Sequence, residues 1–240
     1  MSWNPTTDSF HFIWSISLLK ETTERTVPST ITRLFDPLGF LSSILINAKI
    51  LIQELWSKNL EWDDSLPAQL YDKWTYFLQQ IQELPTLSFS RWLGITSQNS
   101  IEIHGFSDAS QQALAAVVYL RSIDQDEKVH TSLICSKTKV APLKRLTITR
   151  LELSAVVLLT KLVHHIVQFL NLDKAPVHLC TDSASVYTWI SNHTSRLKEF
   201  VHKRVCFIQE AVPTAKWHYI PGNENPADCF TRGLTPSQLS

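Results

Sequence analysis

The chain has 240 residues, 44 % of them hydrophobic and 18 % charged, a balance that excludes a mainly disordered protein. The chain has 22 basic residues (lysine and arginine) and 22 acidic residues (aspartate and glutamate), so its net charge is zero. Nucleic acid could therefore bind only through local basic patches. The four cysteines include no Cys-x-x-Cys pair, which argues against a structural zinc site and a secreted disulfide framework and favours reduced thiols.

Residues 1–27 predict a β-hairpin. Trp3 precedes a run of turn-forming residues at 4–8, and aromatic or apolar side chains then alternate with smaller or polar ones at Phe10, Phe12, Trp14 and Ile16. A hairpin of two strands is marginal in water, so we expect this one to pack against another part of the protein.

Residues 28–97 predict a small helical module. Apolar residues recur at three- and four-residue steps, which predicts helices over about residues 28–35, 41–59 and 68–84, followed by a connector over 89–99. The expected buried stripes are Ile31, Leu34 and Phe35, then Ile44, Leu45, Ala48, Leu51, Ile52, Leu55 and Trp56, then Leu70, Trp74, Phe77, Leu78 and Ile81. The aromatic residues could instead stack on nucleic-acid bases, but their helical spacing favours core packing.

Residues 98–240 predict an α/β domain. Strands are expected near residues 101–106, 113–120 and 129–136 as an antiparallel meander, with further strands at 177–182 and 217–220. Helices are expected at 149–169, 183–191, 197–210 and from 226 onward, the first of them burying Leu151, Ala155, Leu158, Leu162, His165 and Phe169. This order predicts a mixed five-stranded sheet, its first three strands antiparallel, flanked by helices.

Four acids stand where such a sheet gathers its chemistry. Asp108 and Asp182 each follow an apolar strand, and Glu152 and Asp228 lie near helix starts. Each has an ordinary explanation by itself, as a turn former or as an acid favoured by the helix dipole. Converging acids repel one another unless cations lie between them, and Mg²⁺ or Mn²⁺ prefers such oxygen ligands. The four together therefore predict a site for two ions that clamp a phosphate.

The sequence motifs around these acids resemble those of a known enzyme family. Gly-Phe-Ser-Asp-Ala-Ser (105–110), Thr-Arg-Leu-Glu-Leu-Ser-Ala (149–155), Cys-Thr-Asp-Ser (180–183) and Asn-Pro-Ala-Asp (225–228) resemble the Asp-Glu-Asp-Asp set of ribonuclease H. Five longer stretches, at 136–144, 150–159, 225–234, 35–42 and 60–67, are similar to BEL/Pao-type LTR retrotransposon polyproteins. The resemblance covers nearly the whole chain. It implies a ribonuclease H-like domain preceded by a thumb/connection module of reverse transcriptase, with residues 1–27 similar to the end of the palm and its primer grip.

The resemblance also implies a reaction, the hydrolysis of the RNA strand of RNA–DNA hybrids with two Mg²⁺ ions, Mn²⁺ being possible. Asp108 would bridge both ions, Asp228 would help hold the ion that activates water, and Glu152 and Asp182 would hold the other. The implied partners are the hybrid and the reverse-transcriptase palm and fingers, whose Asp-Asp motif this chain lacks. It also lacks the Asp-Thr/Ser-Gly of an aspartic peptidase. A catalytically inactive nucleic-acid-binding remnant is the alternative, whereas an integrase would place its glutamate after the second aspartate.

Several polar residues are candidates for contacts with the nucleic acid. Ser110 and Ser183, next to the acids, could contact 2′-hydroxyls, although turn and cap roles fit them equally. Basic residues could bind phosphates or form a solvated face, namely Lys137, Lys139, Lys144 and Arg145 in an expected loop and Lys198, Lys203 and Arg204 on a helix. The loop at residues 219–228 is short and lacks the histidine that many ribonucleases H carry before the last aspartate. Its absence would affect the turnover rate more than the chemistry. His218 is interpreted as a structural residue.

The sequence carries no recognisable targeting signal. The N-terminus has no basic and apolar regions of a signal peptide, and the uncharged run at residues 37–48, like every other in the sequence, is shorter than the roughly 20 residues that span a bilayer. We therefore expect an intracellular, cytoplasmic protein without a membrane partner, located in a virus-like particle or the nucleus if the retrotransposon resemblance extends to its life cycle.

Overall fold

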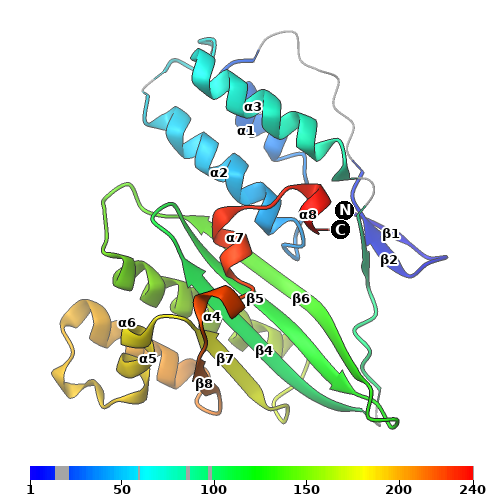
Figure 1. The fold of residues 1–240 in the computed structure, drawn as a ribbon, viewed down its shortest axis with the longest axis vertical. Helices are drawn as coiled ribbons and strands as arrows, with labels where there is room; N and C mark the ends of the chain where they lie inside the picture. The colour runs from blue at the N-terminus through cyan, green and yellow to red at the C-terminus, as the bar shows by residue number, and fades with distance from the viewer. Residues whose placement is uncertain (14–21, 59, 85–86, 97–98, 240) are drawn as a thin grey trace. The chain divides into compact units, whose positions relative to one another are not determined.

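The computed structural model describes residues 1–13, 22–58, 60–84, 87–96 and 99–239, which divide into two compact units (Figure 1). The N-terminal unit comprises Met1–Trp92 with Gly233–Ser240, and the C-terminal unit comprises Leu93–Arg232. The predicted boundary lies at residue 98, and the division between the two units lies between Trp92 and Leu93. The predicted hairpin and the last residues of the chain are both part of the N-terminal unit.

A three-stranded antiparallel sheet forms part of the N-terminal unit. The predicted hairpin consists of β1 (Ser2–Asn4) and β2 (Ser9–His11), and β3 (Ser88–Ser90) adds to the free edge of β2. The prediction of a connector from residue 89 is wrong at its start, because a three-residue strand is too short to show a periodicity. Phe89 of β3 packs edge-on against Phe12. Trp14 and Ile16, predicted to continue the hairpin, lie outside the described residues.

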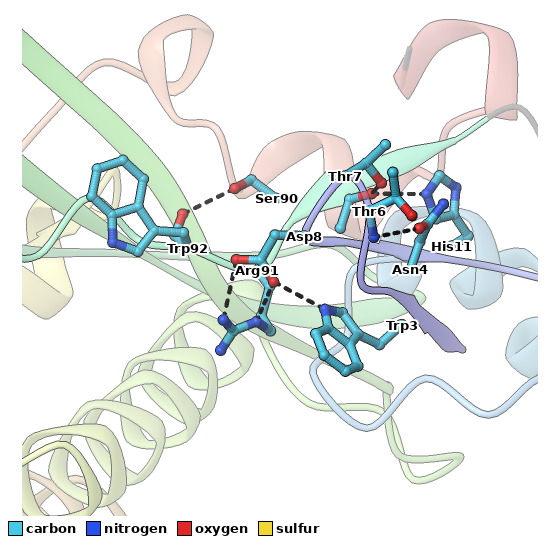
Figure 2. Close-up of polar contacts among 10 residues, drawn as sticks. Trp3, Asn4, Thr6, Thr7, Asp8, His11, Ser90, Arg91 and Trp92 are labelled. Atoms are coloured by element: carbon cyan, nitrogen blue, oxygen red, sulfur yellow. Dashed lines mark hydrogen bonds and ion pairs between the residues drawn. The ribbon is translucent and has the colours of Figure 1, made fainter.

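One carboxylate fastens the turn of this hairpin to β3 (Figure 2). Asp8, which has a left-handed φ of 46°, accepts hydrogen bonds from Arg91 at 2.6 and 3.1 Å and from the indole N–H of Trp3 at 2.9 Å. The guanidinium of Arg91 also lies 5.8 Å from the centre of the Trp3 ring. These donors lower the pKa of Asp8, Arg91 contributing most. The turn predicted at residues 4–8 is thus held by one side chain from β1 and one from the residue after β3.

The helices of the N-terminal unit are α1 (Thr26–Ile31), α2 (Ser42–Trp56), α3 (Ala68–Ile81) and α8 (Pro236–Leu239). Most of the predicted stripes are buried, but Phe35 and Trp56, 65 % and 58 % exposed, are not. Phe35 lies beyond the end of α1, so helical spacing does not apply to it, and Trp56 is the last residue of α2. The Asp36 carboxylate accepts hydrogen bonds from the Phe40 and Leu41 N–H groups and so orders the approach to α2.

The C-terminal unit is built on a five-stranded mixed sheet in the order β6-β5-β4-β7-β8. Its strands are β4 (Ser100–Ala109), β5 (Ala113–Ile123), β6 (Val129–Val140), β7 (Val177–Thr181) and β8 (Lys216–Tyr219). The first three are antiparallel, and β7 and β8 run parallel to β4, which confirms the predicted fold class. Strands β4 and β6 continue beyond their predicted ends because their polar residues remain paired with β5.

The helices of this unit are α4 (Ile148–Phe169), α5 (Ala184–Ser191), α6 (Glu199–Ala211) and α7 (Asp228–Arg232), with single 3-10 turns at Thr194–Arg196 and Gly222–Glu224. Helix α4 crosses close to the sheet at Gly105, where a Cβ atom would lie 2.8 Å from the side chains of Leu159 and Leu179. Because α4 packs on both the sheet and α6, its buried stripe is wider than predicted. The expected burial of His165 and Phe169 is wrong, since the helix carries them to the surface.

Helix α4 is also the one helix in the described part of the chain that is long and apolar enough to cross a membrane by length and composition. More than half of that apolar stretch, 56 %, is buried within the fold, a property of helices that form a protein core. The burial of α4 against the sheet and α6 accounts for its apolar character.

Candidate metal centre

Three of the four predicted acids meet at one end of the sheet in the C-terminal unit. Asp108 is the penultimate residue of β4, Asp182 directly follows β7, and Glu152 lies in the second turn of α4. Because Ser107 of β4 pairs with Thr181 of β7, the next residue of each strand is one of the two aspartates. One carboxylate oxygen from each of the three acids lies within 4.8 Å of the others, an arrangement that could hold a metal ion.

The protein buries two of these carboxylates deeply. Asp108 is 5 % exposed and Glu152 is 8 % exposed. Burial raises the pKa of Glu152 to about 9, with further contributions from the charges of Asp108 and Asp182. Burial also raises the pKa of Asp108, and the charges of Asp182 and Asp228 act in the same direction.

One oxygen of the Glu152 carboxylate, Oε2, is buried without a hydrogen-bond partner. The N–H of Ala109 donates to the Glu152 carboxylate, but a single donor does not offset its desolvation. An unsatisfied oxygen beside two further carboxylates fits a divalent cation with a preference for hard oxygen ligands. The residues present therefore suit a metal ion of this class.

Asp228 lies next to this group but is not part of it. It is the first residue of α7, and its carboxylate forms an ion pair with Arg232 four residues later, at 2.8 Å. Its charge still acts on Asp108, so it is close to the three acids. The structure thus brings together Asp108, Glu152 and Asp182 and holds the fourth predicted acid beside them.

Two polar residues of the site were missed by the sequence analysis. The Thr231 hydroxyl, buried in α7, donates a hydrogen bond to the Asp108 carboxylate. The buried Asn225 side chain donates to the Ser107 carbonyl at 2.9 Å and so fixes the start of α7 to β4. Both residues lie in the 225–234 stretch that carries the retrotransposon resemblance, and Thr231 follows Asp228 by three residues, the spacing of one helical face.

The two predicted serines have local roles. The Ser110 hydroxyl accepts hydrogen bonds from the Gln112 and Ala113 N–H groups in the turn between β4 and β5. The Ser183 hydroxyl caps α5 by accepting from the Val186 N–H at 3.5 Å. These are the turn and cap roles that the sequence left open, and they place each hydroxyl within two residues of the end of a strand that leads to the acid cluster.

The predicted basic loop is only partly a loop. Lys137 and Lys139 lie on β6, so the loop assignment is wrong for them, whereas Lys144 and Arg145 lie exposed in the segment between β6 and α4. Thr138 pairs with Ala115, and Ala115 with Asp108, so alternation directs Lys137 and Lys139 to the sheet face opposite Asp108.

The basic side chains of α6 contact their own helix. Lys203 forms an ion pair with Glu199 at 2.5 Å, and the Arg204 guanidinium lies 3.5 Å from the centre of the Phe200 ring. Lys198, the residue before α6, is exposed. Of these three cations, Lys198 has the fewest contacts that would compete with a phosphate.

Comparison with known proteins gives no match among curated proteins. Among solved structures, LC11-RNase H1 in complex with an RNA/DNA hybrid is 17 % identical over 58 % of this chain and 99 % of that chain, with a TM-score of 0.37. RNase H1 from Halobacterium salinarum is 12 % identical over 53 % of this chain and 89 % of that chain, with a TM-score of 0.35. The foamy viral protease-reverse transcriptase in complex with double-stranded DNA is 14 % identical over 84 % of this chain and 35 % of that chain, with a TM-score of 0.36.

A family model identifies the chain more directly. The model of the Pao retrotransposon-like RNaseH-like domain matches residues 23–183, more than half of the chain. The match spans Asp108, Glu152 and Asp182 and ends before the segment that carries Asp228 and Thr231. The resemblance seen in the sequence motifs is confirmed, and the chain belongs to the Pao retrotransposon-like RNaseH-like domain family.

Proposed function

We propose that this chain is a metal-dependent endonuclease that hydrolyses the RNA strand of RNA–DNA hybrids as part of a retrotransposon reverse transcriptase. The observation that supports this function best is the convergence of Asp108, Glu152 and Asp182 from three separate elements, with a buried Glu152 oxygen that lacks a partner. Burying like charges together is costly, and a nuclease that uses two divalent cations provides a reason for it.

Mg²⁺ is the proposed cation, with Mn²⁺ as a substitute, and Asp108 is the proposed ligand common to both ions. Such ions, when bound, stabilise negative charge on the phosphate and make water a better nucleophile at neutral pH. Glu152 and Asp182 would hold one ion with Asp108, and Asp228 would complete the ligands of the other. Asp228 would first give up its ion pair with the exposed Arg232, which costs little because exposed pairs are worth about 0–1 kcal/mol.

The remaining residues of the site would orient the carboxylates and the substrate. The Thr231 hydroxyl would hold one oxygen of Asp108 in place through its hydrogen bond. Ser183 accepts its capping hydrogen bond through a lone pair, so its own proton stays available for a 2′-hydroxyl of the RNA strand. The Ser110 hydroxyl donates to the Ala113 carbonyl at 3.5 Å and would exchange this long hydrogen bond for one to the RNA strand. Lys144 and Arg145 would contact phosphates from their exposed segment.

Cleavage of a labelled RNA–DNA hybrid in the presence of Mg²⁺ tests the proposal. Wild type should cut the RNA strand and leave a 3′-hydroxyl and a 5′-phosphate, and Asp182→Asn should reduce the rate at least a hundredfold. Asp173→Asn, a change of the same kind at an exposed position before β7, should cut as fast as wild type. Equal rates for wild type and Asp182→Asn would rule out the enzyme.

A nucleic-acid-binding remnant without activity is the alternative, and one observation favours it. Arg232 pairs with the Asp228 carboxylate, so a cation already neutralises the fourth acid. Hybrid binding that is independent of metal, with no cleavage by wild type or by Arg232→Gln, would identify this alternative. If Asp228 is instead a ligand, Arg232→Gln should cut at least as fast as wild type.

A further inference from the structure

One face of the sheet in the C-terminal unit carries both Asp108, at its edge, and a hollow. Alternation along β4 places Asp108, Phe106, His104 and Glu102 on this face. At the Asp108 end, Ala227 and Phe230 of the α7 segment pack over the neighbouring residues of β5. Beyond that segment lies a hollow of about 300 Å³ lined by His104, Phe106, Tyr119, Arg121, Thr131 and Pro226.

His104, at the side of the hollow, is the end of a row of three stacked imidazoles. The His104 and His178 rings are 5.0 Å apart at an interplanar angle of 13°, and the His178 and His218 rings are 5.2 Å apart at 21°. Strand β7, which carries His178, is on one side of β4, and β5, which contributes to the hollow, is on the other. A planar ring in the hollow could therefore stack on the side of His104 that faces away from His178.

The other walls of the hollow suit a planar group with a polar edge. Phe106 and Tyr119 form an edge-to-face pair with ring centres 6.0 Å apart and provide an apolar lining. In the part of the chain that the structure describes, the hydroxyls of Tyr119 and Thr131 have no hydrogen-bond partner. The Arg121 guanidinium uses one N–H for Glu102, at 3.1 Å, and has further donors. Aromatic walls, free hydroxyls and a guanidinium are together the chemistry that binds a nucleobase.

The size and place of the hollow restrict the ligand further. About 300 Å³ is the lower end of the range for small-molecule pockets, which suits a ligand as small as a single base. Along β4, Phe106 and His104 are two and four residues from Asp108, or about 7 and 14 Å at roughly 3.4 Å per residue. Stacked nucleotides rise about 3.4 Å each, so this distance corresponds to two to four nucleotides.

We propose that this hollow binds one unpaired base of a single-stranded tail that continues from the hybrid, at least two nucleotides from the scissile phosphate. A base within the hybrid is paired, so only a base in a single-stranded region can enter without breaking a pair. The identity of the strand rests on the proposed function, but the binding of the base does not require cleavage.

Binding of tailed hybrids tests the proposal. Fluorescence anisotropy would measure the affinity of the full chain for a labelled RNA–DNA hybrid with a six-nucleotide tail, in Ca²⁺, with RNA integrity checked afterwards on a gel. An abasic residue would replace each tail position in turn. We expect one position to weaken binding about tenfold, within the range for loss of a stacked base, and the others to have little effect.

Protein variants then assign the effect to the hollow. His104→Leu and Arg121→Gln should each bind the abasic and complete tails with equal affinity at the sensitive position. His165→Leu, a matched change at an exposed histidine of α4, should retain the tenfold difference. Thermal unfolding would confirm that each variant is folded, and two variants with different side chains guard against a single folding failure.

The outcomes separate this proposal from the proposed function. Equal affinity for all tails, no detectable preference for a tailed over a blunt hybrid, or an undiminished effect in both variants would each overturn the base site, even if the protein cuts hybrids. A position-specific loss that disappears in the variants supports the base site, even in a protein that fails to cut.

Discussion

Replacing Glu152 by glutamine should stabilise the protein in the absence of divalent cations while it abolishes activity. The carboxyl group of Glu152 has a folded-state pKa of about 9, against an ordinary value of 4.5, because it is buried beside Asp108 and Asp182. The folded state therefore binds this proton more tightly than the unfolded state does. Stability from this group is complete below about pH 4.5 and is lost as the pH rises toward 9.

The size of the effect follows from the same pKa. Between pH 4.5 and pH 7 the free energy of unfolding falls by about 1.4 kcal/mol per pH unit, or about 3.4 kcal/mol over two and a half units. Glu152→Gln keeps the shape of the side chain and removes the titration, so it should recover roughly 2–3 kcal/mol at pH 7 after allowance for coupling among the acids. For a unit of this size that corresponds to an increase in Tm of about 6–12 °C.

Thermal and urea unfolding in EDTA, at intervals from pH 5 to pH 8, would measure this effect. Wild type should lose stability across this range, Glu152→Gln should lose much less, and Glu210→Gln, a matched change at an exposed position of α6, should follow wild type. Added Mg²⁺ or Mn²⁺ should raise the Tm of wild type more than that of Glu152→Gln. Parallel pH curves for wild type and Glu152→Gln, or a lower Tm for Glu152→Gln at pH 7, would refute the reasoning.

Three further changes test the supports of the site. Thr231→Val should lower the cleavage rate about tenfold because it removes the hydroxyl that donates to Asp108, whereas Thr231→Ser should restore most of the rate; no loss in the valine variant would contradict the positioning role. Gly105→Ala should lower the free energy of unfolding by about 1–3 kcal/mol in urea titrations, since its Cβ would lie 2.8 Å from leucine side chains of α4 and β7. Asn225→Ala should cost a similar 1–3 kcal/mol because the buried Ser107 carbonyl loses its donor, and a Tm equal to wild type would show that water replaces it.

The sheet of the C-terminal unit could be predicted because its strands are long enough to show their pattern. The alternation from Ile101 to Phe106 and the apolar run before Asp182 place the two aspartates at the same end of neighbouring parallel strands. What could not be predicted is that β4 continues through Asp108. Residues 107–110 are small and polar and locally favour a turn, but pairing with β5, and at Ser107 also with β7, keeps residues 107–109 in the strand.

Other features depended on contacts that a sequence pattern does not contain. Strand β3 has three residues, Ser-Phe-Ser, and is recognisable only from its pairing with β2. The stripe of α4 is wider than predicted because the helix has two packing partners, and its far end leaves Phe169 76 % exposed. The hydrogen bond from Thr231 to Asp108 joins residues more than a hundred positions apart, so spacing alone could place Thr231 only on the same helix as Asp228.

Burial of Glu152 has a second consequence that joins stability to function. With a pKa of about 9, this carboxyl group holds its proton at neutral pH when no cation is present, and only the carboxylate is an effective ligand. Binding of a cation must therefore release that proton, and the affinity for the cation should increase with pH until the group is ionised without it. A partly exposed glutamate would avoid both the loss of stability and this dependence on pH. The buried position instead makes the full negative charge of the site conditional on the presence of a cation, because the protein supplies no other group that satisfies Glu152 Oε2 within the residues described.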